Sequence, residues 1–278
     1  MSFNSVNTNR QAVFALQSLN TTNGELSGVQ KRVSTGFRVA DARDDGGAFA
    51  VAQAVRSDVA GVTAVGEQLG GTRGILSTTF ASLSVVSDTM KQVRAVLTRM
   101  ADAAVTGNTR IQYEEQYKLL TSQVATFIDD AFYNGRTLLK TAVAAGGGNI
   151  TSIRNETGGT FTIEAVDGAN LKLDATLPAN AAAAVTRLTP GTGDFAQADA
   201  AISTALNKFG AQMQFVENQI TYNSKKIDAL NDGLGALVDA DLAKESSKLQ
   251  ALQTRQQLGI QTLGIANQGP QVLLSLFR

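Results

Sequence analysis

The most regular feature of the chain is an apolar seam in its second half. Apolar side chains recur there at alternating steps of four and three residues, which is the period of one face of an α-helix. The seam consists of Ile202, Leu206, Phe209, Met213, Val216, Ile220, Ile227, Leu230, Leu234 and Leu237. A polar residue, Asn223, fills the one gap in the pattern. A stripe this narrow cannot bury itself, so we expect it to pack on another helix or on another copy of the chain.

A shorter seam with the same step lies upstream. It consists of Tyr113, Tyr117, Leu120, Val124 and Phe127. We expect these residues on a helix from about residue 109 to residue 132, ended by the turn sequence Tyr133-Asn134-Gly135. The pattern alone leaves pairing within one chain and pairing between chains equally open.

The N-terminal part of the chain predicts two further helices. The apolar positions of the first are Val6, Val13, Leu16, Leu19, Leu26, Val29 and Val33. Gly36 suits its C-cap, whereas Gly24 and Gly28 each weaken it by about 1 kcal/mol. A long Ala-rich helix then spans about residues 48–104, with an aspartate before it as its cap. We expect the glycines at 61, 66, 70, 71 and 74 to bend or break its middle.

The helical period disappears between residues 140 and 193. Residues 160–166 and 169–174 alternate in period two around Asp167-Gly168, which predicts a β-hairpin. A loop longer than two residues is favoured, because it sets Leu171 and Leu173 opposite Ala165 and Ile163. Residues 150–154 are a candidate for one more strand, and Asp194 is expected to cap the helix that carries the long seam.

A final helix is predicted after residues 239–241. Its apolar positions are Leu249, Leu252, Leu258 and Leu263, and an apolar tail follows with Val272, Leu273, Leu274, Leu276 and Phe277. A solvated terminus normally avoids such a tail, because an exposed apolar patch invites association. The tail either docks in its own core or packs on other subunits, and we favour the second.

Composition argues for a mainly α protein without catalytic chemistry. The chain has only three Pro, which suits long uninterrupted helices. The 278 residues hold 24 Lys plus Arg and 24 Asp plus Glu, so no basic field exists to hold nucleic acid or an anionic membrane. Cys and His are absent, which removes disulfides, the usual general base and the commonest metal ligand. We therefore expect no cofactor, no metal and no enzyme activity. A hydrolase on a helical scaffold, the rival from another class, is improbable for the same reason.

Two features have both a functional and an ordinary interpretation. The pairs Asp44-Asp45 and Asp129-Asp130 suggest acid–base or metal chemistry, but adjacent residues point in different directions on a helix, so capping or solvation is far more common. Asn223 either fixes the register of the seam or is a defect tolerated at its edge, and the two interpretations are about equally frequent.

The two ends of the chain together resemble bacterial flagellin. The resemblance rests on Asn7-Thr-Asn9, Arg32-Val-Ser-Thr-Gly36-Phe-Arg-Val39 and Ala42-Arg-Asp-Asp45 near the start. At the end it rests on residues 239–243, on Ala266-Asn-Gln268 and on Pro270-Gln-Val-Leu-Leu-Ser-Leu-Phe-Arg278. It covers about residues 1–140 and 199–278, and the short middle is similar to that of alphaproteobacterial flagellins.

The resemblance implies a fold: a long antiparallel helical hairpin forming a coiled-coil rod, a small β-hairpin insert, and terminal helices that form a filament-core coiled coil. It implies a core layer of residues 1–38 and 242–278, a rod of residues 39–140 and 199–241, and a surface insert of residues 141–198. The two seams then pair inside one subunit as the rod core. The N-terminal stripe, the last helix and the tail pack between subunits.

The resemblance also implies the function, a structural subunit of the flagellar filament that assembles for swimming motility. The expected partners are other copies of the chain, the flagellar export apparatus, an export chaperone, the filament cap and the hook-junction proteins. Nucleic acid and membrane insertion are not expected. No signal peptide and no membrane-spanning run is visible, so composition alone indicates a cytoplasmic protein; export through the flagellum replaces that interpretation.

One rival within the same class shares the helical ends, namely a hook–filament junction protein, and the last nine residues argue against it. The family commonly carries sugars on Ser and Thr. Thr151 and Thr160 are candidate positions, on the ground that the middle of the chain is expected to be exposed.

Overall fold

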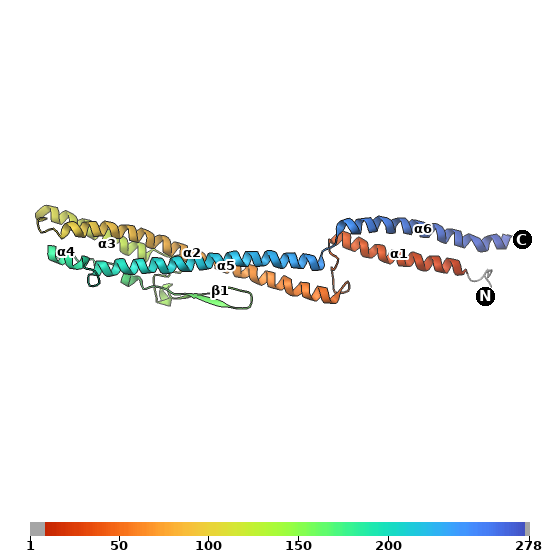
Figure 1. Ribbon diagram of the computed structural model, residues 1–278, viewed down its shortest axis with the longest axis horizontal. Coiled ribbons are helices and arrows are strands. Elements are labelled where there is room, and N and C mark those ends of the chain that lie inside the picture. The colour runs from red at the N-terminus through yellow and green to blue at the C-terminus, as the bar shows by residue number, and fades with distance from the viewer. Residues whose placement is uncertain (1–8, 276–278) are drawn as a thin grey trace. The chain divides into compact units, whose positions relative to one another are not determined.

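The computed structural model describes the backbone of residues 9–275 and the side chains of residues 9–268. Its long helices are α1 (Arg10–Thr35), α2 (Gly46–Met100), α3 (Gly107–Asp129), α5 (Asp194–Val238) and α6 (Leu242–Ser275). The short elements are α4 (Ala181–Leu188), the 3₁₀ turns η1 (Val143–Ala145) and η2 (Gly168–Leu171), and the strands β1 (Ile150–Ile153) and β2 (Thr160–Ile163). The mainly α class with a small β-hairpin is confirmed (Figure 1).

The chain divides into two compact units, which we call the terminal unit and the central unit. The terminal unit comprises residues 1–57 and 229–278, and the central unit comprises residues 58–228. The boundaries fall inside α2 and α5, so each of these helices contributes residues to both units.

One hydrophobic core organises the central unit and contains both predicted seams. Tyr117, Leu120 and Val124 of α3 are buried there, as are Ile202, Phe209 and Val216 of α5. Tyr113, Phe127, Leu206, Met213 and Ile220 pack against the same core. The apolar side of α2 joins them with Leu83, Val86, Met90, Val93 and Leu97. Each seam is therefore buried in a core that a third helix shares.

The seam of α5 changes character toward its end. Ile227 and Leu230 are half-buried. Leu234 and Leu237 belong to the terminal unit, where they pack against a small cluster of Val39, Ala52 and Val238. The one long stripe in the sequence thus serves two separate cores.

The predicted hairpin around Asp167-Gly168 is wrong. The strands expected at residues 150–154 and from residue 160 are confirmed as β1 and β2, but these two strands form the hairpin with each other, antiparallel from Ile150↔Ile163 to Ile153↔Thr160. The segment after β2 turns to another partner, because the backbone N–H groups of Val166 and Gly168 donate to the carbonyls of Leu138 and Leu139 at 2.8 and 2.9 Å. The apolar residues that follow are buried in the central core from the η2 turn onward. Their alternation reflects burial against helices and not a strand.

The predicted break in the long Ala-rich helix is also wrong, since α2 continues through all five of its central glycines. Val62, Leu69 and Leu76, which lie among these glycines and just after them, are fully buried. Burial of this side of the helix offsets the intrinsic cost of the glycines.

Local end signals were predicted well except at α5. Gly36 ends α1 in the left-handed region with φ 74°, and Asp45 Oδ1 accepts from the N–H of Ala48 at 3.0 Å to cap α2. Asp194 begins α5 but does not cap it, because its carboxylate turns to Arg187, with Oδ2 3.3 Å from Nη1. The pattern of residues 140–193 gave no sign of α4, which Asn180 caps through the N–H of Ala183 at 2.8 Å.

Candidate assembly surface

The terminal unit is built on two helices from opposite ends of the chain. Figure 1 shows α1 and α6 side by side, and they enclose a small apolar cluster of Leu26, Val29 and Leu252, with Val33 and Leu249 packed against it. These five residues were predicted to pack between subunits, and the structure buries them, fully or in part, between two helices of one molecule.

Polar contacts extend the pairing of α1 and α6 beyond this cluster. Arg32 Nη1 lies 3.4 Å from Glu245 Oε1, and Gln256 donates to Asn23 Oδ1 at 2.8 Å. Asn9 donates to the carbonyl of Ala266 at 2.6 Å. The two helices therefore contact each other along most of the length of α1.

The loop between α1 and α2 ties this pair to the end of α5. The N–H of Ala240 donates to the carbonyl of Gly36 at 2.9 Å, and that of Arg38 donates to Val238 at 2.7 Å. Lys31 of α1 holds the same loop through Asp41 and Asp44, at 2.9 and 2.8 Å. The ammonium of Lys31 and the N–H of Arg43 lower the pKa of Asp41 to about 2.

The remaining predicted packing residues of α1 and α6 divide into exposed and half-buried positions. Val13, Leu16 and Leu258 are 64%, 47% and 55% exposed. Leu19 and Leu263 are half-buried. Val6, Leu276 and Phe277 lie outside the described residues, and the side chains of Val272, Leu273 and Leu274 lie outside the described side chains.

Sequence reasoning missed three exposed apolar residues on the same helices. Phe14, Ile260 and Ile265 are 69%, 57% and 69% exposed. They lie off the apolar stripes, so a periodicity search passes over them. The available signal is the absence of charge around them.

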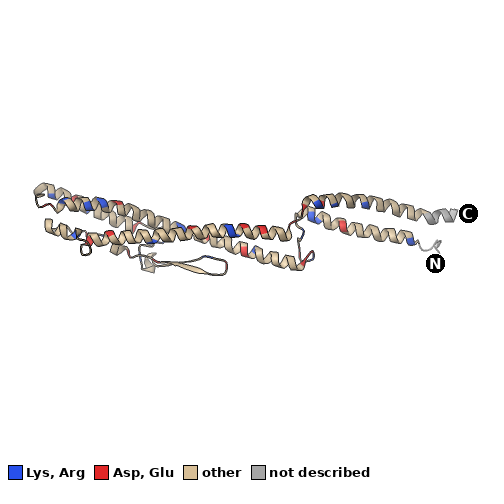
Figure 2. Cartoon of the chain, in the orientation of Figure 1, with Lys and Arg blue, Asp and Glu red and all other residues tan. Residues whose placement is uncertain are grey.

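That absence of charge defines the surface. Between residues 11 and 24 α1 has no Lys, Arg, Asp or Glu, and neither does α6 between residues 256 and 268 (Figure 2). We call the exposed apolar residues of these two stretches, Val13, Phe14, Leu16, Leu258, Ile260 and Ile265, the open apolar surface. Large exposed apolar side chains without nearby charges are typical of protein association sites.

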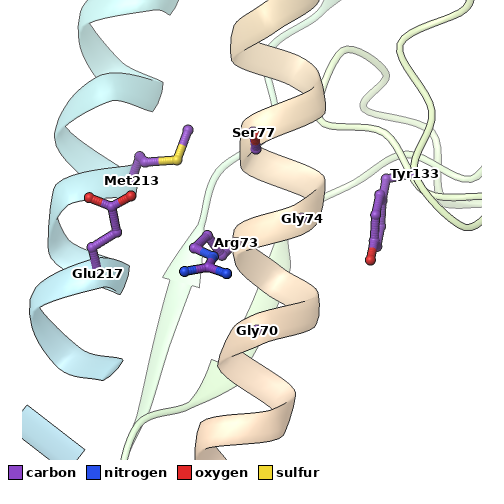
Figure 3. Close-up of a pocket in the computed structure, with 7 residues that line it drawn as sticks. All are labelled: Gly70, Arg73, Gly74, Ser77, Tyr133, Met213 and Glu217. Atoms are coloured by element: carbon purple, nitrogen blue, oxygen red, sulfur yellow. The ribbon is translucent and has the colours of Figure 1, made fainter. Parts of the chain in front are cut away.

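A groove on the central unit is a weaker candidate site than the open apolar surface. It has a volume of about 400 Å³ and is lined by Gly70, Arg73, Gly74, Ser77, Tyr133, Met213 and Glu217. Figure 3 shows Arg73 extending from α2 toward Met213 and Glu217 of α5, with the Tyr133 ring on the other side of α2. Gly70, Gly71 and Gly74 lie inside α2, so they form no loop that cradles a phosphate.

The paired carboxylates have structural partners. Asp129 accepts from Lys172 at 2.6 Å, Asp130 is the C-cap residue of α3, and Asp45 caps α2. Among the residues that the structure describes, no group of three or more His, Cys, Asp or Glu is placed to hold a metal ion. In the same part of the chain, no helix is long and apolar enough to cross a membrane.

Comparisons with known proteins identify the family of the chain. Residues 6–144 match the family model of the bacterial flagellin N-terminal helical region, and residues 195–277 match that of the C-terminal helical region. The chain is 35% identical to flagellin FljK of Caulobacter vibrioides over 283 residues, covering 100% of both chains. It is 30% identical to a flagellin of Brucella melitensis over 290 residues, covering 99% of both. Both matches run from one end of the chain to the other, and the chain belongs to the bacterial flagellin family.

Proposed function

We propose that the open apolar surface of α1 and α6 is where this flagellin binds its neighbours during polymerisation. As a member of its family, the chain is a structural subunit of the bacterial flagellar filament. The observation that supports our proposal is the exposure of six large apolar side chains on two stretches without charge. Burying such a side chain contributes about 1.5–3 kcal/mol, so a few of them offset much of the cost of association.

The surface suits a polymer better than a closed ring. Contacts between different patches of identical subunits generate open helical assemblies when the rotation does not close. We propose that residues 1–38 and 242–278 form the inner layer of the filament and that residues 39–140 and 199–241 surround it. Residues 141–198 then face outward, with Thr151 and Thr160 exposed on β1 and β2 as candidate glycosylation positions.

Export and the accessory partners complete the proposal. The chain is expected to leave the cell through the flagellar export apparatus with the help of a chaperone, and to be placed by the filament cap beyond the hook-junction proteins. A strain that lacks a working flagellar export apparatus is expected to retain the protein inside the cell. Secretion at the normal level from that strain would contradict this route.

Deletion of residues 272–278 tests the role of the tail in assembly. We expect the truncated protein to form no filaments under seeded conditions by electron microscopy, because the deleted segment is strongly apolar. Far-UV circular dichroism and thermal unfolding should show a folded central unit, since its core is built from residues 58–228. Filaments of normal length from the truncated protein would refute the proposal.

A further inference from the structure

Asn223, the polar residue in the apolar seam, is buried, and both polar atoms of its side chain form hydrogen bonds. It is 3% exposed. Its Nδ2 donates to the carbonyl of Arg154 at 3.3 Å, and its Oδ1 accepts from Gln219 Nε2 at 3.1 Å. It is therefore not a defect facing solvent at the edge of the seam. A buried amide without hydrogen-bond partners costs free energy, so Asn223 requires a specific arrangement of partners around it.

That arrangement is the tip of the β-hairpin, residues 154–159. The Arg154 carbonyl accepts from two side-chain amides of α5, that of Asn223 and that of Gln219, the latter at 3.1 Å. Glu156 forms an ion pair with Lys226, one turn further along α5. The tip is closed on itself by the N–H of Arg154, which donates to the carbonyl of Gly159 at 2.8 Å.

The same hairpin is attached to α2. Ser152 and Thr72 are 1% and 5% exposed, and their hydroxyl oxygens lie 3.2 Å apart. Near the tip, a Cβ added to Gly61 of α2 would lie 3.0 Å from the Cβ of Glu156. The absence of a side chain at position 61 therefore lets the tip lie against α2.

We propose that the hairpin tip is a clamp that fixes the axial register of α5 against α2 within the central unit. An apolar seam with a repeating four-three step tolerates an axial shift of its partner helix with little loss of free energy, because apolar side chains face each other again after the shift. The polar contacts of the clamp do not tolerate such a shift. A slip of one helical turn moves a residue by about 5.4 Å, which is beyond hydrogen-bond reach for the Arg154 carbonyl and for the Ser152 hydroxyl.

Trypsin provides the first test, because it cleaves after Arg154 only when the tip leaves α5. We expect Asn223→Ala to raise the cleavage rate after Arg154 about tenfold, since the tip then opens more often. Asn218→Ala, which changes an exposed Asn on the same helix, is the matched control and should cleave like the wild type. Equal rates for Asn223→Ala and the control would overturn the clamp.

A distance measurement tests the register itself. The chain has no cysteine, so spin labels can be placed at Glu67→Cys on α2 and Ser224→Cys on α5, both exposed. We expect one narrow distance distribution with Asn223 present, and a broadened or shifted one with Asn223→Ala. An unchanged distribution would overturn the proposal.

Two further variants keep the test decisive. If Asn223→Ala does not fold, Gln219→Ala removes one of the two donors to the Arg154 carbonyl at a half-buried site. Faster cleavage after Arg154 and a broadened or shifted distance distribution are expected for this variant too.

Asn223→Leu distinguishes loss of the clamp from loss of stability, because it makes the seam apolar while removing the bond to the tip. We expect that variant to unfold no earlier than the wild type and still to be cleaved faster after Arg154; wild-type cleavage would count against the clamp. Filament formation is a separate readout, so failure here leaves the proposed assembly surface untouched.

Discussion

Glycines that are alike in the sequence have different surroundings in α2. A Cβ added to Gly74 would lie 2.6 Å from Cζ of Tyr133, whereas one added to Gly71 would meet no atom within 4 Å. The ring of the turn residue Tyr133 therefore occupies the space that a side chain at position 74 would need. Nothing in the central unit requires glycine at position 71.

Alanine substitutions should separate these two glycines. We expect Gly71→Ala to raise the free energy of unfolding by about 1 kcal/mol, because Ala is the better helix former. Gly74→Ala should bring no such gain in the free energy of unfolding, since the Tyr133 ring must move away. Chemical unfolding of both variants is the measurement. In a protein that already carries Tyr133→Ala, adding Gly74→Ala should again raise the free energy of unfolding relative to Tyr133→Ala alone. A gain from Gly74→Ala alone would contradict the contact.

The pair formed by Lys31 and Asp41 makes one contribution to stability depend on pH. The pKa of Asp41 falls from 3.8 to about 2 in the folded protein, because Lys31 and the Arg43 N–H bind its carboxylate. A lowered carboxylate pKa stabilises the fold above the ordinary pKa, and this stabilisation is lost as the pH falls through the folded value.

We expect the stability difference between the wild type and Asp41→Asn to be constant from about pH 5 to pH 7. It should shrink as the pH falls from 3.8 to about 2. Added salt should reduce the difference at neutral pH, because the pair is exposed enough to be screened. Urea unfolding as a function of pH is the measurement, and a difference that grows toward low pH would show that the carboxylate is not the stabilising group.

Among the elements, helices with a clear period and the positions of both strands were predictable, but the pairing of the strands and the short helix α4 were not. The seams of α3 and α5 and the end signals at Gly36 and Asp45 are local, so the sequence alone locates them. The hairpin position depended on which backbone groups pair with residues 138–139, and α4 is held by contacts of its Arg187 with Tyr117 and Asp174. Such contacts leave no periodic trace, which explains both errors.

Arg187 connects α4 to α3 and to the start of α5. Its guanidinium, 14% exposed as a side chain, donates to the Tyr117 hydroxyl of α3 at 2.6 Å and to the carbonyl of Asp174 at 3.0 Å. It also faces the carboxylate of Asp194 at the start of α5. Burial raises the pKa of Tyr117, so its hydroxyl stays neutral and accepts this bond.

Replacing Arg187 should therefore loosen α4. We expect Arg187→Gln to lower the free energy of unfolding by about 3 kcal/mol, because it leaves buried polar groups without partners. Lys91→Gln, which breaks an exposed pair with Asp88, should change it by less than about 0.5 kcal/mol. Urea unfolding compares the two variants, and equal losses would show that the Arg187 network is no stronger than a surface pair.

For the whole molecule, the sequence predicted the class of function better than the details of the surface. The apolar stripes indicated assembly, but the stripe of α1 is divided: Leu26 and Val29 are buried against α6, whereas Val13 and Leu16 are exposed. Periodicity cannot make this division, because it depends on where the partner helix lies. The exposed Phe14 and Ile265 were missed because they lie off the apolar stripes.

Two matched valine substitutions test the central claim that the open apolar surface drives polymerisation. Val13 on α1 and Val185 on α4 are 64% and 51% exposed, so serine at either site should leave the monomer folded. Seeded filament growth, followed by light scattering and electron microscopy, is the measurement. We expect Val13→Ser to slow or stop growth, and Leu258→Ser to strengthen the defect, while Val185→Ser grows like the wild type. Growth of the combined Val13→Ser and Leu258→Ser variant at the wild-type rate would contradict the account.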